Sequence, residues 1–421
     1  MPIKDHGRQY DLVVFGATGY SGQLVAEHIA ANLPAHLKWA VSGRSTDKLK
    51  KVVERCKVLS QGHSEPEIEV CQLNGEEVSV LARKTFCLIA VVGPYARYGE
   101  HAFKACAEAG THYFDCTPEV PWTMSMIKKY EAMAKASGAC MFPQCAMESA
   151  PSDLLTWALA AEARKTMFSQ ICDVVLELHE LQSIPSGGTV TTLMNIFDQY
   201  SLKTIRQSLK PYALSPVPND HPAPRKSLLS SLSGVTRVPG LGTLTTSVTG
   251  PANAAIVFRT WGLTKQESNL QKEFYGPRFT YREFMYGHGV IGAFLMHYSV
   301  LVGAGLILFP PFRSLLKKFF KPGEGPDREK ARNESIEFRA VATPDIEPKA
   351  GMSKQVFGKL LYTGSMYYLT AALVAQGART LLEDKSGRLT GGVYTPACLG
   401  QTYIDNLGEV GLKVETGVKE F

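Results

Sequence analysis

Three glycines follow the first apolar run of the chain at a spacing typical of phosphate-binding turns. They are Gly16, Gly19 and Gly22, within the stretch VVFGATGYSGQLVAEHI over residues 13–29. Gly16 would permit a tight turn, Gly19 a close backbone approach to a pyrophosphate, and Gly22 close packing of helix on strand. Backbone N–H groups at the start of the next helix would face the anion. The stretch predicts a dinucleotide site, with a plain structural turn as the alternative. The residues of this loop predicted to bind the cofactor are Gly16, Thr18, Gly19, Tyr20, Ser21 and Gly22.

The next strand-like segment ends in a cationic sequence that bears on which dinucleotide is bound. The residues are Gly43, Arg44 and Ser45, with Lys48 about one helical turn later. A site for NAD would place Asp or Glu here to accept from the ribose 2′-hydroxyl group. A cation can instead pair with a 2′-phosphate, so Gly43, Arg44 and Lys48 predict NADP(H). The alternative is that Arg44 only caps a solvated helix face.

The stretch VVGPYARYGE, over residues 91–100, could lie against the nicotinamide end of the cofactor. Gly93 and Pro94 would bring the backbone close to the ribose, together with Tyr95. Reduction of a polarised double bond needs a proton besides the hydride, so Tyr95 and Tyr98 are candidate catalytic proton donors. The alternative for both tyrosines is packing. Glu119 could act as an acid or base, but a place at a helix start is the favoured interpretation.

These residues lie among alternating strand-like and helix-like segments, which predict a doubly wound parallel sheet of the Rossmann type over residues 1–146. The expected strands cover residues 10–15, 37–43, 67–73, 86–93, 111–116 and 139–143. The expected helices cover residues 20–31, 46–56, 99–109 and 121–137.

A second, mixed α+β domain is expected from residue 147. Its first part, 147–288, contains a predicted strand over 173–181, a glycine turn opening a helix over 186–200, and a Pro/Ser-rich loop over 211–240. Residues 350–421 are expected to complete this domain with a helix over 365–383, then a short helix and a terminal strand. A very charged segment, 321–349, is predicted to be a linker.

The segment 289–320 differs from the rest of the chain in its hydrophobicity. Residues 289–309 contain no Asp, Glu, Lys or Arg and would form about 31 Å of helix, close to the thickness of a hydrocarbon core. Pro310 and Pro311 and the basic amphipathic stretch FRSLLKKFFK follow. The segment predicts membrane association, monotopic or as a hairpin in preference to spanning, because a single crossing would separate two parts of one globular unit. A buried core helix is the alternative.

Composition excludes several classes of protein. The 421 residues carry a formal net charge of +6, without the basic arm or aromatic-interleaved cation run of a nucleic-acid binder. Nine scattered cysteines form no C-x-x-C pair, so no metal site is predicted, and a reducing, cytosol-facing compartment is expected. The N-terminus shows no apolar stretch of the kind found in secretory signals.

The motifs together resemble those of saccharopine dehydrogenase-like oxidoreductases and the related trans-acting enoyl reductases. Besides the glycine loop, the matching stretches are VSGRS, VVGPYARYGE, CAEAGTHYFDCTPE, ESAPSDL, SGGTVTTL and GGVYTPA. The resemblance implies NADP(H) use, a Rossmann domain, a second domain partly closed by the C-terminal segment, a hydrophobic segment between the halves and, in animal relatives, lipid-droplet association. Relatives usually read G-F-D-S-x-P-x-D-L where this chain has AMESAPSDL over residues 146–154, so the substrate stays open.

The leading hypothesis is an NADPH-dependent reductase of an enoyl, imine or carbonyl group. Its substrate would be apolar, polyketide- or lipid-like, from a biosynthetic pathway such as that of a secondary metabolite, and carrier-tethered in one version. The alternative is a non-catalytic NADP(H)-binding scaffold on a membrane or lipid droplet. The predicted location is the cytoplasmic side of such a surface, or otherwise the cytoplasm. A homodimer is one option for the assembly.

Overall fold

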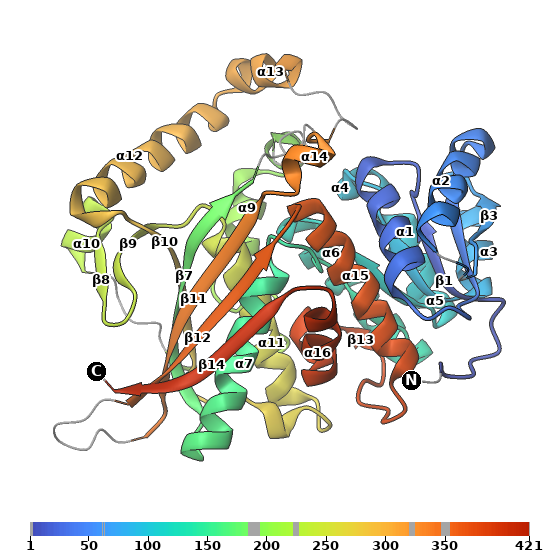
Figure 1. Cartoon of the computed structure of the whole chain (residues 1–421). Helices are drawn as coiled ribbons and strands as arrows, with labels where there is room; N and C mark the ends of the chain where they lie inside the picture. The colour runs from blue at the N-terminus through green and yellow to red at the C-terminus, as the bar shows by residue number, and fades with distance from the viewer. Residues whose placement is uncertain are drawn as a thin grey trace.

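Two seven-stranded sheets form the framework of the computed structural model, with helices packed between and around them (Figure 1). The structure describes residues 3–60, 62, 64–183, 194–221, 227–319, 325–346 and 354–420. Part of the helix predicted over 186–200 lies outside the described residues, and the described part, 194–199, is helical.

The first sheet is parallel throughout and confirms the predicted doubly wound architecture. In spatial order it consists of β13 (Gly392–Val393), β6 (Cys140–Phe142), β5 (His112–Asp115), β4 (Thr85–Ala90), β1 (Tyr10–Phe15), β2 (Trp39–Gly43) and β3 (Glu67–Val70). The connecting helices are α1 (Tyr20–Asn32), α2 (Thr46–Leu59), α3 (Gly75–Lys84), α4 (Tyr95–Tyr98), α5 (Glu100–Ala109) and α6 (Val120–Ser137). The central strands β1 and β4 are buried along their whole length, as expected for strands covered on both faces.

Helix α3 was not among the helices that the sequence predicts. It begins with a side-chain N-cap, because the side chain of Asn74 accepts a hydrogen bond from the backbone N–H of Glu77. Val78, Leu81 and Ala82 are buried at helical spacing. The apolar stripe is short, and the strand that follows begins directly after Arg83 and Lys84 with no loop between the two elements.

The second sheet belongs to the predicted α+β domain and contains both parallel and antiparallel strand pairs. In spatial order it consists of β14 (Lys413–Glu420), β12 (Lys354–Thr363), β11 (Ser335–Pro344), β7 (Ile171–Gln182), β10 (Thr280–Tyr286), β9 (Gly242–Thr246) and β8 (Thr236–Val238). Among the described strand pairs of this second sheet, only β7 and β10 run parallel to each other. The helices of this part of the chain are α7 (Ala150–Met167), α9 (Leu202–Ser208), α10 (Leu228–Ser233), α11 (Gly250–Gln266), α14 (Arg328–Ala331), α15 (Met366–Glu383) and α16 (Gln401–Glu409), with short 3-10 helices over Gln271–Glu273 and Pro396–Leu399.

Two predictions for the second part of the chain are wrong. The segment 321–349 is not a linker throughout, because β11 occupies the centre of the second sheet and pairs with β7 and β12. The segment 211–240 is not loop throughout, because it contains α10 and β8. Most of the charged residues of 321–349 lie before or after β11, which itself carries only Glu337 and Arg339. The average composition of the segment therefore hides the strand.

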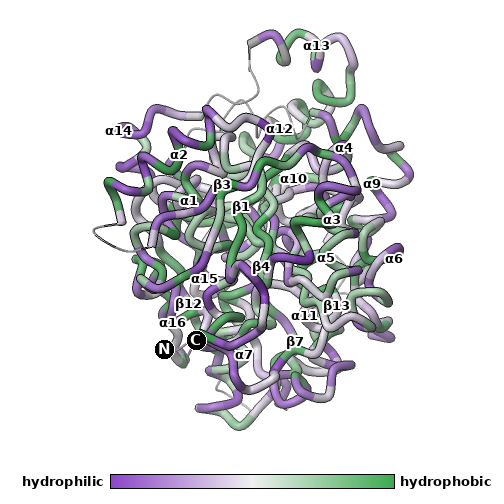
Figure 2. Tube along the Cα trace, turned by 90° about the vertical axis from the view of Figure 1, so that its right-hand side faces the viewer, coloured by the Kyte–Doolittle hydropathy of each residue, from purple (hydrophilic) through white to green (hydrophobic). Residues whose placement is uncertain are grey.

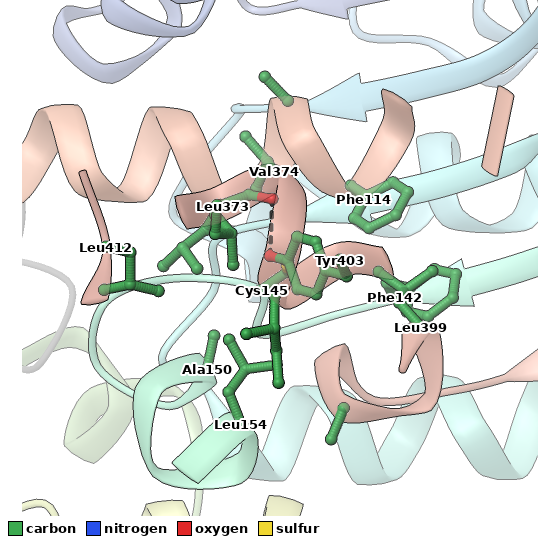
Figure 3. Packing of buried hydrophobic residues seen from close by; sticks show 14 of the residues in the cluster. Phe114, Phe142, Cys145, Ala150, Leu154, Leu373, Val374, Leu399, Tyr403 and Leu412 are labelled. Carbon is green, nitrogen blue, oxygen red and sulfur yellow. Dashed lines mark hydrogen bonds between the residues drawn. The ribbon is translucent and has the colours of Figure 1, made fainter. Parts of the chain in front are cut away.

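The C-terminal part contributes to both sheets, although the sequence predicts that it completes only the second. Strand β13 extends the first sheet beside β6, and α15 packs against α1. The hydroxyl of Tyr403 on α16 donates a hydrogen bond to the backbone oxygen of Leu373 on α15, inside a cluster that includes Phe114 and Leu154 (Figure 3). One continuous hydrophobic core therefore joins the two sheets.

The hydrophobic segment forms an arm that extends from the body of the protein. Helix α12 (Gly289–Leu308) runs outward from the region of β8, β9 and α10 to α13 (Pro310–Phe319), which protrudes from the rest of the described chain (Figures 1 and 2). Among the described helices, α12 alone is long and apolar enough to cross a membrane, and only 11% of its most apolar window is buried. The alternative of a buried core helix is therefore wrong.

Candidate cofactor and active site

The glycine loop between β1 and α1 is built around two positions where no side chain fits. Gly16 has a positive φ of 91°, and a Cβ atom there would lie 2.5 Å from the backbone oxygen of Val91. A Cβ atom on Gly22 would lie 2.2 Å from the backbone oxygen of Gly16. Both distances are far below van der Waals contact, so the tight turn and the close approach of α1 to the loop require glycine.

Gly19 differs from these two glycines because it faces open space. It is the N-cap of α1 and provides no side-chain cap, and the nearest atom to a Cβ there would be 3.5 Å away. The first turn of a helix leaves its backbone N–H groups without intrahelical acceptors. These groups are therefore available to an anion, and the helix dipole favours negative charge at the same place. Thr18 and Ser21 are half-buried beside this turn.

Tyr20 has a structural partner in a distant part of the chain. Its hydroxyl donates a hydrogen bond to the backbone oxygen of Pro326 at 3.1 Å, and its ring packs directly against Gly325. Arg328 then donates to both carboxylate oxygens of Glu27 on α1, at 2.8 and 3.0 Å. The chain that returns from the arm is thereby fastened to the first helix next to the glycine loop.

Arg44 directly follows β2 and Lys48 lies in the first turn of α2, both with exposed side chains. Within the described part of the chain, neither side chain has an ion pair or hydrogen bond, so both cations are available to a ligand. The N-cap of α2 is Ser45, whose hydroxyl accepts from the backbone N–H of Lys48. Arg44 is therefore not needed as a helix cap, which removes the alternative role considered for it. Gly43 lies beside Thr18 of the glycine loop.

Tyr95 is not placed to act as a proton donor, contrary to the prediction. It is buried, and its hydroxyl donates to the backbone oxygen of Ala90 at 2.8 Å and lies 3.2 Å from the sulfur of Cys116. Burial raises the pKa of this hydroxyl well above its usual value. Tyr98 is half-exposed on the same short helix, and Gly93 is exposed, so the backbone there is open to a ligand.

Glu119 holds this loop in place. It is the N-cap of α6, and its carboxylate accepts the backbone N–H groups of Tyr95 and Ala96 at 2.8 and 2.9 Å. The interpretation of Glu119 as a helix-start residue is confirmed. The loop over residues 93–98 is fixed at the carboxyl end of β4, which is where ligands bind in open α/β sheets.

Glu148 is a candidate acid that the sequence analysis does not single out. It lies immediately before α7, is half-buried, and receives no hydrogen bond from another residue among those described. Burial raises the pKa of its carboxyl group. It is close enough to Cys116 for the two groups to interact electrostatically, and Cys116 follows β5 at the same sheet edge as the residues after β4. The departure of AMES from the usual family sequence is the signal that could have identified it.

The other residues of the ESAPSDL stretch have structural roles. The carboxylate of Asp153 accepts from the hydroxyl of Thr260 at 2.5 Å and from the backbone N–H of Ala397 at 2.9 Å. Thr395 contacts the same threonine hydroxyl at 2.6 Å. Burial raises the pKa of Asp153 to about 7. The ESAPSDL and GGVYTPA stretches, which are far apart in sequence, are therefore joined at α7.

A second polar cluster surrounds Glu283 on β10. Its carboxylate accepts hydrogen bonds from hydroxyl and amide groups on α7, on the β9–α11 connection, on α11 and on β10 itself, which saturate both of its oxygens. The donors are Ser152, Ser247, Thr249, Asn253 and Tyr281. The cluster fixes the start of α11 against the second sheet.

The N-terminal part of the chain matches a known family. Residues 12–141 match the model described as saccharopine dehydrogenase NADP binding domain. Proteins named trans-acting enoyl reductase, from Mycobacterium tuberculosis and Mycobacterium leprae, are each 28% identical to this chain, with 97% of this chain and 98% of the relative covered. The matched domain contains the glycine loop, Arg44 and the loop over residues 93–98.

The fold also matches a solved structure over nearly its whole length. Apo saccharopine dehydrogenase (L-Glu forming) from Saccharomyces cerevisiae superimposes with a TM-score of 0.55 at 11% identity, covering 97% of this chain and 100% of the other. This likeness shows the fold alone. The glycine loop and the free cations at the end of β2 fit NADP(H). Residues 12–141 match the saccharopine dehydrogenase NADP binding domain, and the protein is an NADP-binding oxidoreductase.

Proposed function

We propose that the protein is an NADPH-dependent reductase of an enoyl group in an apolar, polyketide- or lipid-like substrate. The observation that carries the proposal is the pairing of the open glycine turn with the free Arg44 and Lys48. Glu148 interacts electrostatically with Cys116, which follows β5 at the same edge of the first sheet. The names of the mycobacterial relatives favour an enoyl group over an imine or a carbonyl group.

The residues of this chain divide the work between binding and proton supply. The N–H groups of the first turn of α1 hold the pyrophosphate, and Arg44 and Lys48 hold the 2′-phosphate. NADPH, when bound, supplies the hydride to one carbon of the double bond. The protonated carboxyl group of Glu148 donates the proton to the other carbon and is reprotonated from water. A carboxyl group whose pKa is raised by burial keeps that proton at a higher pH than an exposed one.

A turnover assay tests this proposal. NADPH oxidation is measured with a 2-enoyl thioester, a cyclic imine and a ketone, with the wild-type protein and with Glu148→Gln. We expect oxidation with the enoyl thioester, a kcat about 100-fold lower for Glu148→Gln, and an unchanged Kd for NADPH. Glu108→Gln, at an exposed position that pairs with Lys104, is the matched control and should leave kcat unchanged.

The pH dependence separates a proton donor from a packing residue. The wild-type kcat should fall as the pH rises through the raised pKa of Glu148, because the acid must be protonated to act. Glu148→Gln should lose this limb of the profile. If NADPH binds but is oxidised with none of the three acceptors, the result would contradict the proposed reductase activity and support the scaffold instead. An unchanged kcat in Glu148→Gln would remove Glu148 from the reaction.

A further inference from the structure

Helices α10 and α12 present one exposed apolar surface, which we call the apolar arm. More than half of the large apolar side chains that are exposed on the described chain belong to these two helices and the residue after α12. They are Leu228, Leu229, Leu232, Val290, Ile291, Phe294, Leu295, Tyr298, Leu301, Val302, Leu306, Leu308 and Phe309. Monomeric soluble proteins rarely expose contiguous apolar surface on this scale, so the arm is an interaction surface.

The exposed large side chains of α12 are gathered on one side of the helix. At 3.6 residues per turn, residues 291, 294, 295, 298, 302 and 309 fall within about half of its circumference. The other half carries the small residues Gly292, Ala293, Gly303 and Ala304, together with Met296, Val300 and Ile307, which are half-buried. A helix surrounded by lipid on all sides has no need of this division. It is typical of a helix with one side against a protein body and the other against an apolar phase.

The first half of α12 is fastened to the second sheet and to α10. Ala293 and His297 are buried. The hydroxyl of Thr245 on β9 donates to the backbone oxygen of Ala293 at 2.7 Å, and the hydroxyl of Thr246 lies 2.8 Å from Nδ1 of His297. The hydroxyl of Tyr298 donates to the backbone oxygen of Leu232 on α10 at 3.1 Å.

The far end of the arm returns to the same body. The chain after α13 is held at α1 by the contact of Tyr20 with Pro326 and by the ion pair of Arg328 with Glu27. Both ends of the segment are therefore tied to one globular unit with a continuous core. A single crossing of a bilayer by α12 would break these attachments, because it would place the two ends on opposite sides.

The charge around the arm is positive. No acidic residue occurs between residues 284 and 323, whereas Arg313, Lys317, Lys318 and Lys321 follow α12 directly. Lys318 is exposed on α13, and Arg313 pairs with Asp198. Two copies of this surface would bring like charges together, which disfavours self-association. Anionic headgroups complement the lysines, and acyl chains complement the apolar side chains.

We propose that α10, α12 and α13 seat the protein on an anionic lipid surface, with α12 in the plane of the interface and not across it. The leucines of α10 enter the lipid beside those of α12, and Lys318 of α13 contacts the headgroups. This docking is independent of the proposed reduction.

Vesicle flotation of the full-length protein tests the proposal. The vesicles contain phosphatidylcholine alone, or equal parts of phosphatidylcholine and phosphatidylserine. We expect flotation with the anionic vesicles and weaker flotation with phosphatidylcholine alone. Leu229→Glu on α10 and Ile291→Glu on α12 should each weaken binding by about tenfold, since each replaces an apolar side chain that would be buried in the lipid by a charged one. Lys318→Glu should weaken binding only to the anionic vesicles.

Val58→Glu is the matched control, because Val58 is as exposed as these residues but lies on α2. It should float like the wild type, and all variants should keep the wild-type Kd for NADPH as a check of folding. A wild-type protein that stays soluble with both vesicles would overturn the proposal. So would a lipid-free dimer, seen by sedimentation velocity, that Ile291→Glu dissociates. Resistance of the membrane-bound protein to alkaline carbonate extraction would overturn the in-plane orientation.

Discussion

One carboxylate oxygen of Glu119 accepts the backbone N–H of Tyr95 at 2.8 Å, so the residue that begins α6 also fixes the loop after β4. The other oxygen accepts the N–H of Ala96. Two adjacent strands of the first sheet thus share a buried anchor at their carboxyl ends. This anchor leaves the backbone of Gly93 exposed, and the Tyr95 side chain is directed into the core.

Removing the Tyr95 hydroxyl should therefore affect stability and not proton supply. Tyr95→Phe leaves the backbone oxygen of Ala90 without its donor, which should lower the free energy of unfolding by about 1 to 2 kcal/mol. Chemical denaturation measures this loss, and the pH profile of turnover should keep its shape. Tyr98→Phe, at a half-exposed position, is the comparison and should leave the stability unchanged. A stability loss in Tyr98→Phe equal to that in Tyr95→Phe would contradict this assignment.

Arg44 should set the preference for NADP(H). Arg44→Asp replaces a free cation by a carboxylate that repels the 2′-phosphate, so the Kd for NADPH should rise by about 10- to 100-fold, equivalent to about 1.5 to 3 kcal/mol. The Kd for NADH should change far less. Fluorescence titration with both cofactors measures the ratio of the two Kd values. Lys50→Asp, at an exposed position on α2, serves as the control. Equal weakening for both cofactors would contradict the role of Arg44.

Substitutions at two glycines of the loop should have different effects on the melting temperature and on the Kd for NADPH. Gly22→Ala places a Cβ atom 2.2 Å from a backbone oxygen, so the melting temperature should fall and NADPH binding should be lost. Gly19→Ala should keep the wild-type melting temperature, because its Cβ meets no atom closer than 3.5 Å and its φ is ordinary. Its Kd for NADPH should nevertheless rise, since the new methyl group stands where the pyrophosphate approaches. Wild-type affinity in Gly19→Ala would place the phosphates elsewhere.

His28 should make the protein acid-sensitive. It is fully buried between α1 and α15, and burial lowers its pKa to about 3, whereas the unfolded chain takes up the proton near pH 6.5. The stabilising contribution is therefore present above pH 6.5 and is lost as the pH falls from there toward 3, at about 1.4 kcal/mol per pH unit.

The test compares the free energy of unfolding of the wild type with that of His28→Gln between pH 7 and about pH 4.5. The difference between the two proteins should shrink toward acid pH, because the variant has no imidazole to protonate. His36→Gln, at an exposed position, should follow the wild type over the same range. Parallel curves for the wild type and His28→Gln would show that His28 takes up its proton without unfolding.

Features that depend on residues close together in the chain could be predicted from the sequence. The glycine spacing, the apolar run of β1 and the cation after β2 report local geometry, because a tight turn and a buried strand each restrict the residues within them. The parallel first sheet follows from the alternation of strands with helices. The hydrophobic arm is likewise visible as a stretch without charge.

Other features depend on partners that are distant in the chain, and only the tertiary structure decided them. Tyr95 is of a residue type that can donate a proton, but its ring is buried against Trp122. Its backbone N–H is bound by the carboxylate of Glu119. Strand β11 lies within a segment whose average composition is that of a linker, but it pairs with β7 and β12 on both edges. Periodicity records which side of an element is apolar and not which other element covers it. For the same reason α10 could be recognised as part of the apolar arm only once Leu232 was seen beside Tyr298.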